Sequence, residues 1–234
     1  MTLWWLVGQL PATHPYFWWS FREKPSRAPG GCGLRSKNCR QRKSANERDV
    51  ILTDREIRNS IEAGQFDIIP RPPIDHYSST TVDLTLSSIL RIFKTPSEGM
   101  KQAIDPGRPG FNATKLINSL TERHDIDPAN GFDLERGVLI LGWTNESVDL
   151  KEHCRIAARV EGKSSLARVG LGIHVTAPII HTGFKAPIQL EIINHGPLPI
   201  CLRSGMRICQ LAFETTLGMP DRAYKGQFLG QQAS

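Results

Sequence analysis

The chain has 234 residues, which is long enough to bury a sizeable core in one large domain or two small ones. Its formal net charge of +6 comes from the N-terminal part, because residues 22–48 hold nine Lys/Arg against two Glu and residues 49–234 sum to about −1. A basic balance is typical of nucleic-acid-binding proteins, but here it does not belong to the expected folded body, so we expect no nucleic-acid partner.

Residues 1–48 form a basic extension that holds four of the five Trp, namely Trp4, Trp5, Trp18 and Trp19. Gln, His and Pro interrupt its apolar part, so no run approaches the ~20 residues of a membrane span. Its cations follow the apolar stretch, whereas a secretory signal has them in front. We predict a poorly ordered, disordered leader ahead of a domain at 49–234, with no membrane partner. An arm that binds a membrane surface or another protein is the alternative.

The five cysteines show neither a C-x-x-C pair nor a His/Cys spacing typical of zinc ligands. An odd number of cysteines without a compact framework suits a reducing compartment. We therefore expect a cytoplasmic protein without structural zinc.

Order is expected to begin at Val50, just before a helix. Thr53 to Glu56 has the pattern of a capping box, in which the Thr hydroxyl and the Glu carboxylate satisfy free backbone N–H groups. Ile57 and Ile61 are four residues apart on one face, and Gly64 supplies the stop. The sequence predicts a short helix of about three turns.

Short apolar runs then alternate with Gly, Pro, Asn and Asp, which is typical of β-strands separated by turns. The runs lie at 82–86, 89–93, 138–141, 156–160, 173–175, 188–192 and 208–213. Many short strands without long helices indicate an all-β sandwich or barrel. The stretch 96–131 is rich in Pro, Gly and charge, and we interpret it as an insertion or lid with one helix at 114–122.

The run from Gly162 to Arg168 combines small residues, two hydroxyls and two cations. Ser164 and Arg168 are four residues apart and would share a face of a helical turn. Together with Lys163 and backbone amides, they could hold a triphosphate through charge-assisted hydrogen bonds. A solvated turn with surface cations is the alternative.

Glu191 is the only carboxylate in the apolar run Ile188 to Ile192, and Ile193 shares its face, so the strand is expected to be covered on both sides. Acidic side chains are seldom buried without a partner. Glu191 therefore either meets a cation as a structural group or is tuned for proton transfer. Gln210, on a later strand, could donate to phosphate or close a surface hydrogen bond.

These segments occur together in an order that resembles the dCTP deaminase family, relatives of the trimeric dUTPases. The resemblance covers about residues 49–230, without a gap across 132–213. It is carried by the segments 51–57, 82–84, 132–148, 160–171, 173–177, 188–194, 205–211 and 223–227.

The resemblance implies a mainly β, distorted jelly-roll or β-sandwich of the dUTPase-like type with a short N-terminal helix. It implies a homotrimer with sites between subunits. It also implies hydrolytic deamination of dCTP to dUTP and ammonia, feeding thymidylate synthesis.

The same resemblance implies the residue roles. Glu191 would act as general base and acid, Ser164 and the Ala177 carbonyl would hold the attacking water, and Arg168 would anchor the substrate. The implied nucleotide-binding residues are Lys163, Ser164, Ser165, Leu166, Ala167, Arg168, Ala177, His181, Gln189, Leu190, Glu191, Gln210 and Gln227. Mg²⁺ would be bound through the substrate triphosphate, with no protein side chain as metal ligand. The H-x-E and P-C-x-x-C pattern of zinc deaminases is absent from the sequence, which fits water activation by a carboxylate.

The chain departs from the family pattern at two places. His181-Thr182 stands where the family has an Asp-Pro pair that contacts the deoxyribose, and Ala223 stands where the tail usually has Lys. His differs from Asp in shape and charge. Two alternatives remain open: a bifunctional deaminase and dUTP diphosphatase that gives dUMP, and a non-catalytic trimeric nucleotide-binding regulator.

Overall fold

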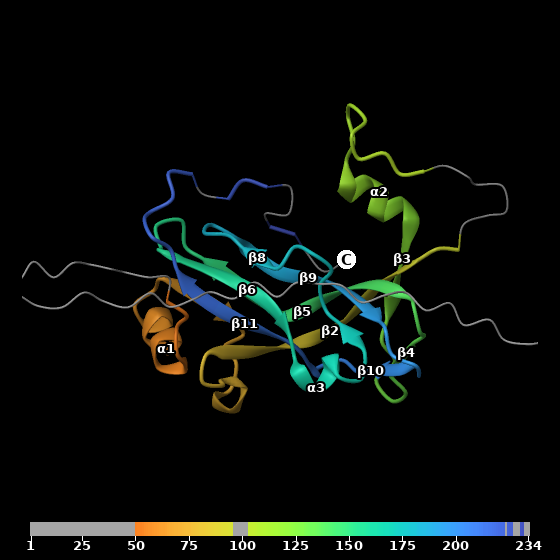
Figure 1. Ribbon diagram of the computed structural model, residues 1–234, viewed down its shortest axis with the longest axis horizontal. Coiled ribbons are helices and arrows are strands. Elements are labelled where there is room, and N and C mark those ends of the chain that lie inside the picture. Colours follow the sequence, from red (N-terminus) through yellow and green to blue (C-terminus); the bar gives the residue numbers. More distant parts are fainter. Residues whose placement is uncertain (1–49, 96–102, 223, 227–229, 232–234) are drawn as a thin grey trace, which may run out of the picture. The chain divides into compact units, whose positions relative to one another are not determined.

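The computed structural model describes residues 50–95, 103–222, 224–226, 230 and 231. The predicted leader and Gln227 lie outside these residues. The described helices are α1 (Asp54–Glu62), α2 (Ala113–Leu120) and α3 (Ser164–Ala167), with a 3-10 turn η1 (Ile74–His76). The strands are β1 (Phe66–Ile69), β2 (Thr81–Phe93), β3 (Thr121–Asp125), β4 (Phe132–Leu134), β5 (Leu139–Leu150), β6 (Ile156–Gly162), β7 (Leu171–Gly172), β8 (Ile179–Ile180), β9 (Lys185–Asn194), β10 (Ile200–Leu202) and β11 (Arg207–Thr215). The prediction of a mainly β protein with a short N-terminal helix is confirmed (Figure 1).

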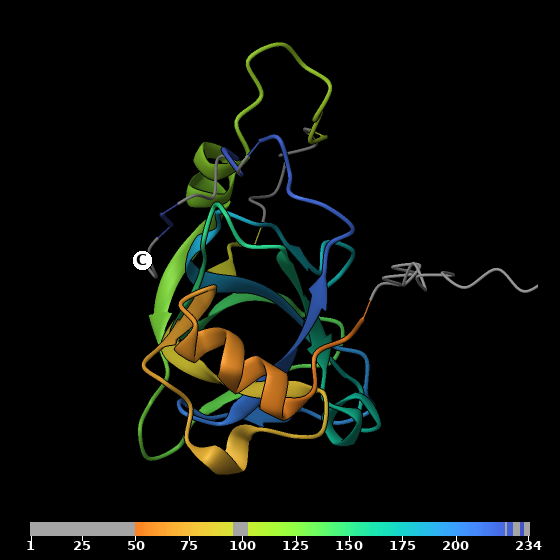
Figure 2. The same ribbon diagram turned by 90° about the vertical axis from the view of Figure 1, so that its left-hand side faces the viewer.

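Helix α1 forms as its local sequence predicts. The N–H of Glu56 donates to Thr53 Oγ1 at 3.5 Å, which is the Thr half of the expected capping box. Ile57 and Ile61 are buried, and the helix ends two residues before Gly64. Figure 2 shows α1 lying across one end of the curled sheet. Its apolar face therefore closes that end of the core.

Most of the described strands belong to one antiparallel sheet of nine strands, in the order β7-β9-β5-β2-β11-β6-β8, with β1 beside β5 and β3 beside β2. Long strands change partners along their length: β2 pairs with β11 at its start and with β5 and β3 at its end. β5 likewise pairs with β2 up to Thr144 and with β1 from Ser147. Such changes at irregular registers bend a sheet, and they allow this one to curl around a single core. β4 and β10 form a separate pair.

The core lies inside the curl and is built from alternate residues of these strands. On β9 every second residue from Ala186 to Asn194 is buried, and β5 and β2 contribute Ile140, Leu84 and Leu90. Phe66 and Phe213 stack with ring centroids 4.4 Å apart. Period-two burial of this kind is what the alternating sequence predicts.

Two expectations about elements have different outcomes. The helix expected at 114–122 is present as α2, and β3, which follows it, pairs with β2. The strand expected at 173–175 is wrong, because the chain leaves the sheet after Gly172. Instead of pairing with the backbone of β9, the N–H of Val175 donates to the side-chain oxygen of Glu191 on that strand.

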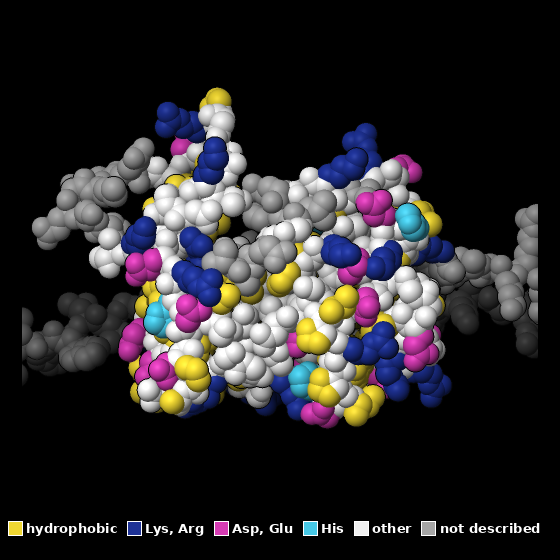
Figure 3. Space-filling model, turned by 180° about the vertical axis from the view of Figure 1, so that it is seen from behind, with side chains coloured by type: hydrophobic (Ala, Val, Ile, Leu, Met, Phe, Trp, Pro, Cys, Tyr) yellow, Lys and Arg dark blue, Asp and Glu magenta, His cyan; other side chains and the backbone are white. Residues whose placement is uncertain are grey.

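The surface of the described domain mixes charges of both signs. On the face seen in Figure 3, Lys and Arg side chains lie among Asp and Glu side chains. This agrees with the near-neutral balance of residues 49–234. Among the described residues, none of the helices has the length and apolar character needed to cross a bilayer.

Candidate active site

Strand β9 carries Glu191 on its half-exposed face. Gln189 and Glu191 point away from the core, while Ile188, Leu190 and Ile192 point into it. The expectation that both faces of this strand are covered is therefore wrong for the single chain. Ile193 shares the face of Glu191 as expected, but it is only partly buried, because none of the described residues packs fully over that face.

A pocket of about 250 Å³ lies against this face of β9. It brings together five of the predicted residues: Ala177, His181, Gln189, Leu190 and Glu191. Gln189, Leu190 and Glu191 come from β9, and Ala177 and His181 come from the loops on either side of β8.

The carboxylate of Glu191 is held but not neutralised. Val175 N–H donates to Glu191 Oε2 at 3.3 Å. No ion pair to Glu191 is present among the residues that the structure describes. The hydrogen bond orients the carboxylate, which faces the pocket without a salt bridge among the described residues. The structural alternative, in which Glu191 meets a cation, is not what the described chain shows.

The predicted phosphate loop lies on a different part of the domain. β6 ends at Gly162, and the residues from Ser164 to Ala167 form the single turn α3, beyond the end of β6 at the bottom of Figure 1. Arg168 N–H donates to the Ser164 carbonyl at 3.2 Å, so the two residues are one helical turn apart as predicted. Ser164, Ser165, Ala167 and Arg168 are exposed, and Leu166 packs against the core.

The sharp exit from this turn depends on Gly170. Its φ is 97°, and a Cβ at this position would lie 2.2 Å from the backbone nitrogen of Gly196. A side chain is therefore excluded both by the backbone conformation and by the close approach of a second backbone. Gly170 thus fixes the direction in which the loop leaves α3 for β7.

Lys163 and Gln210 secure the base of the loop. Lys163 Nζ lies 2.5 Å from Asp83 Oδ2. Gln210 Nε2 donates to the Gly162 carbonyl at 3.0 Å, and Gln210 Oε1 accepts from Thr81 Oγ1 at 2.9 Å. In this chain both side chains hold β2, β6 and β11 together beneath α3.

Asp83 is a functional candidate that the sequence did not single out. It is buried on β2 between Val82 and Leu84, which are themselves buried, and Arg207 Nη1 approaches it at 3.6 Å. One alternative for Glu191 was an acid that is paired with a cation in a strand covered on both faces. Asp83 fits this description. The signal that could have found it is the same: one carboxylate in an alternating apolar strand.

The two groups of predicted residues do not meet in one chain. Of the residues from Lys163 to Arg168, and Gln210, none lines the pocket that contains Glu191. The described chain therefore presents two half-sites, one with the proton-transfer candidate and one with the hydroxyl and cation candidates.

His181, which replaces an expected acid, takes part in an aromatic contact. Its ring stacks on that of Tyr224, with centroids 5.7 Å apart and planes at 13°. Tyr224 also lines the Glu191 pocket. The sequence predicts His181 as a nucleotide-binding residue, and it did not predict the contact with Tyr224.

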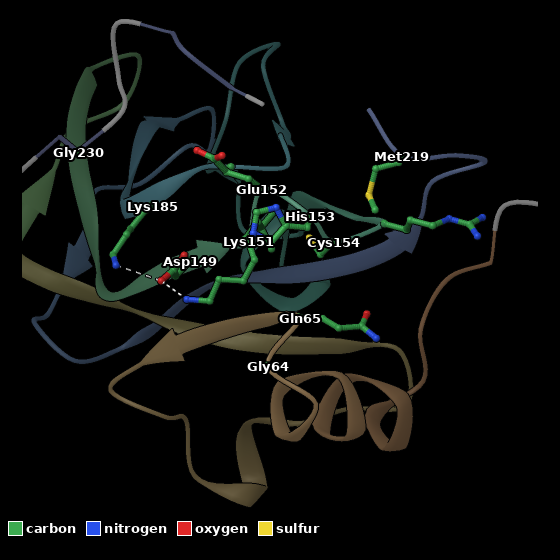
Figure 4. Close-up of a pocket in the computed structure, with 13 residues that line it drawn as sticks. Gly64, Gln65, Asp149, Lys151, Glu152, His153, Cys154, Lys185, Met219 and Gly230 are labelled. Atoms are coloured by element: carbon green, nitrogen blue, oxygen red, sulfur yellow. Dashed lines mark hydrogen bonds and ion pairs between the residues drawn. The ribbon is translucent and has the colours of Figure 1, made fainter. Parts of the chain in front are cut away.

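A larger cavity of about 1000 Å³ has none of the predicted residues in its lining (Figure 4). Asp149 accepts hydrogen bonds there from Lys151 Nζ at 2.5 Å and lies 3.2 Å from Lys185 Nζ. Burial raises the pKa of Asp149, but the hydrogen bonds from the two lysines outweigh it, so that its pKa is below the usual range. The cations are thus already satisfied by protein, and we do not assign this cavity to the nucleotide.

Among the described residues, no group of three or more His, Cys, Asp or Glu side chains is placed to hold a metal ion.

Comparison with known proteins decides the family. A family model described as dCTP deaminase-like matches residues 51–216. The chain belongs to this family. A dCTP deaminase of Marinomonas sp. (strain MWYL1) is 37% identical over 174 residues, 74% of this chain and 87% of the relative. One of Shewanella amazonensis is 38% identical over the same shares of the two chains.

A crystal structure of 2'-deoxycytidine 5'-triphosphate deaminase from Agrobacterium tumefaciens is similar in fold, with a TM-score of 0.54 and 25% identity. The similarity covers 71% of this chain and 48% of that one, so this chain spans about half the length of the solved structure. These findings confirm the predicted family, the fold class and the assignment to enzymes. The predicted site residues that the structure describes all lie within the matched region 51–216. Tyr224, which also lines the Glu191 pocket, lies beyond that region.

Proposed function

We propose that this protein deaminates dCTP hydrolytically, giving dUTP and ammonia. The observation that carries the proposal is Glu191, oriented by the N–H of Val175 beside a pocket of about 250 Å³ and free of an ion pair among the described residues. The choice of dCTP as substrate rests on the relatives described as dCTP deaminases, which align with 74% of the chain.

In the proposed reaction, Glu191 removes a proton from water as the oxygen attacks C4 of the cytosine. As the new C4–O bond forms, the electron pair of the C4–N3 double bond moves onto N3. Glu191 passes the proton to this nitrogen. The tetrahedral intermediate carries a hydroxyl and an amino group on C4. Glu191 takes the hydroxyl proton and delivers it to the amino group, the bond from C4 to the amino nitrogen breaks, ammonia leaves, and the C4 carbonyl of dUTP forms while N3 keeps its proton. Because the carboxylate ends in its starting state, no other acid or base is required.

The remaining roles need the second half-site. Ser164 Oγ and the Ala177 carbonyl would hold the water, and Arg168 would bind substrate and the charge that develops on it. Since Ser164 and Arg168 lie outside the Glu191 pocket of their own chain, we propose that a neighbouring subunit supplies them in a homotrimer. Cyclic symmetry provides three equivalent sites of this kind.

The triphosphate would bind near α3, where Ser164, Ser165 and Arg168 are exposed. Mg²⁺ would be carried by the phosphate oxygens, since oxygen ligands with several waters are what this ion prefers. It would neutralise phosphate charge, and Glu191 would act without a metal-bound water.

The cysteines support a reducing compartment, and we place the activity in the cytoplasm. Cys154, Cys201 and Cys209 are unpaired among the described residues. Burial raises the pKa of the Cys209 thiol, with the carboxylates of Glu146 and Asp83 acting in the same direction. A thiol of this kind is unreactive and packs as a small apolar side chain.

One incubation tests the proposal. The purified full chain is mixed with dCTP and Mg²⁺, and ammonia, dUTP, dUMP and pyrophosphate are measured together. We expect ammonia and dUTP in equal amounts. Formation of dUMP and pyrophosphate instead would assign the bifunctional reaction, and binding of dCTP without ammonia release would contradict an enzymatic role.

A further inference from the structure

The Glu191 pocket shares a wall with a second cavity. That cavity, of about 530 Å³, lies on the side of Thr216 to Arg222. His181 and Tyr224 line both the second cavity and the Glu191 pocket. The two rings therefore separate the pocket from the neighbouring space.

The wall is made by residues from two distant parts of the chain. His181 follows β8, and Tyr224 belongs to the segment after β11. Their rings are nearly parallel at 13° with centroids 5.7 Å apart, which is the offset-stacked geometry that aromatic pairs prefer. An aspartate at position 181 has no ring and could not make this contact.

Further contacts hold Tyr224 at the same place. Its backbone N–H donates to the Thr182 carbonyl at 3.0 Å, and its ring lies 6.2 Å from that of Phe184 at a tilt of 56°. Tyr224 is partly buried and packs against the core. The ring is thus docked on the residues around β8 by one backbone bond and two aromatic neighbours.

Gly226 completes the docked conformation. A Cβ at this position would lie 2.3 Å from Tyr224 Oη and 2.4 Å from Cζ. Any side chain at position 226 would therefore displace the Tyr224 ring or the backbone that folds back against it.

We propose that His181 is a positioning residue, whose ring docks Tyr224 so that Tyr224 closes the Glu191 pocket on the side of the second cavity. The docking itself is a property of the free protein. Its effect on nucleotide affinity rests on the proposed deaminase function. The matched family region ends at residue 216, so the contact joins the family domain to a segment beyond that region.

Limited trypsin digestion tests the docking without any nucleotide. Cleavage after Lys225, followed by intact mass spectrometry, reports the fraction of molecules in which Tyr224 is undocked, because proteolysis tracks the open population. Loss of one aromatic pair shifts such an equilibrium by about 2- to 10-fold. We expect His181→Ala to accelerate this cleavage by that factor and His181→Phe, which keeps a stacking ring, to restore slow cleavage. His153→Ala, at an exposed histidine away from Tyr224, is the matched control.

A second pair of variants keeps the test decisive if His181→Ala does not fold. Tyr224→Leu should accelerate cleavage, and Tyr224→Phe should not. Equal cleavage of wild type and both ring-deleting variants would overturn the proposal. So would fast cleavage of His181→Phe, since the ring nitrogens and not the stack would then be required.

The kinetic consequence is measured separately. With dCTP as substrate, Tyr224→Leu should raise KM about 2- to 10-fold while kcat changes less, and Tyr224→Phe should raise KM less. An inactive wild-type protein would contradict the proposed function and leave the proteolysis result standing. An active protein in which Tyr224→Leu lowers kcat alone would overturn the positioning role.

Discussion

At the scale of single residues, the proposed chemistry depends on how Glu191 differs from two other acids on the strands of the sheet, Asp83 and Glu146. Glu191 is half-exposed and accepts one backbone N–H. Asp83 is buried and paired with Lys163, and Glu146 is buried and accepts from the Thr85 N–H and hydroxyl at 2.9 and 2.8 Å. Asp83 and Glu146 are thus engaged in contacts that hold strands together, whereas Glu191 accepts one backbone N–H and faces a pocket. This difference supports the proposed role of Glu191.

Replacing Glu191 by Gln removes the proton acceptor while keeping shape and an oxygen for the Val175 N–H. We expect deamination to fall by about 10²- to 10⁴-fold, the usual size of a general acid–base contribution. Nucleotide binding should stay close to wild type. Ammonia release measures the first effect and equilibrium titration with dCTP the second.

Glu152→Gln is the matched control for this change, since Glu152 is exposed in the larger cavity. It should leave the rate unchanged. Wild-type turnover in Glu191→Gln would show that another group carries the proton.

At the scale of elements, side-chain contacts between the strands β2, β6 and β11 hold the chain just before α3 in place. Lys163 is tied to β2 through Asp83, and Gln210 ties β11 to the end of β6 and to Thr81 on β2. These contacts leave the exposed side chains of α3 available while its backbone is held. A loop that is held before substrate arrives loses less entropy on binding.

Asp83→Asn tests this base. The substitution keeps the shape but removes the negative charge beside Lys163, so we expect the free energy of unfolding to fall by about 1–3 kcal/mol. KM for dCTP should also rise as the loop loosens. Urea denaturation monitored by circular dichroism gives the first quantity.

Asp75→Asn provides the comparison, because Asp75 pairs with Arg207 at 2.6 Å on the surface. Exposed pairs contribute about 0–1 kcal/mol. If Asp83→Asn cost no more than Asp75→Asn, the buried pair would have no special role in holding the loop.

At the scale of the whole molecule, the separation of the two half-sites is the main result. One chain has Glu191 in a pocket and Ser164 and Arg168 on an exposed turn elsewhere. In a ring of identical subunits, each interface can bring one half-site of each kind together. The proposed activity is therefore a property of the assembly.

Mixing two inactive variants tests this. Trimers reassembled from equal amounts of Glu191→Gln and Arg168→Ala subunits contain interfaces with both wild-type groups, and random assembly restores roughly a quarter of wild-type activity. Each variant alone serves as the control. Mixtures as inactive as the separate variants would place the whole site within one chain.

The sequence by itself determined what depends on neighbouring residues. Thr53, Ile57 and Ile61 specify α1 through a cap and a helical face, and alternating apolar runs specify most of the strands. The order of motifs across about residues 49–230 identified the family, which the family model over residues 51–216 confirms, and it singled out Glu191 as the candidate acid and base.

Only the tertiary structure decided what depends on distant partners. Lys163 meets Asp83 across 80 positions and Gln210 meets Thr81 across 129, so no local pattern could assign them as structural ties. Residues 173–175 leave the sheet, and the N–H of Val175 donates to Glu191, sixteen positions away. His181 became an aromatic partner because the chain beyond β11 returns to it. Contacts of this kind form when strands close into a sheet, and their geometry is set by that closure and not by local propensity.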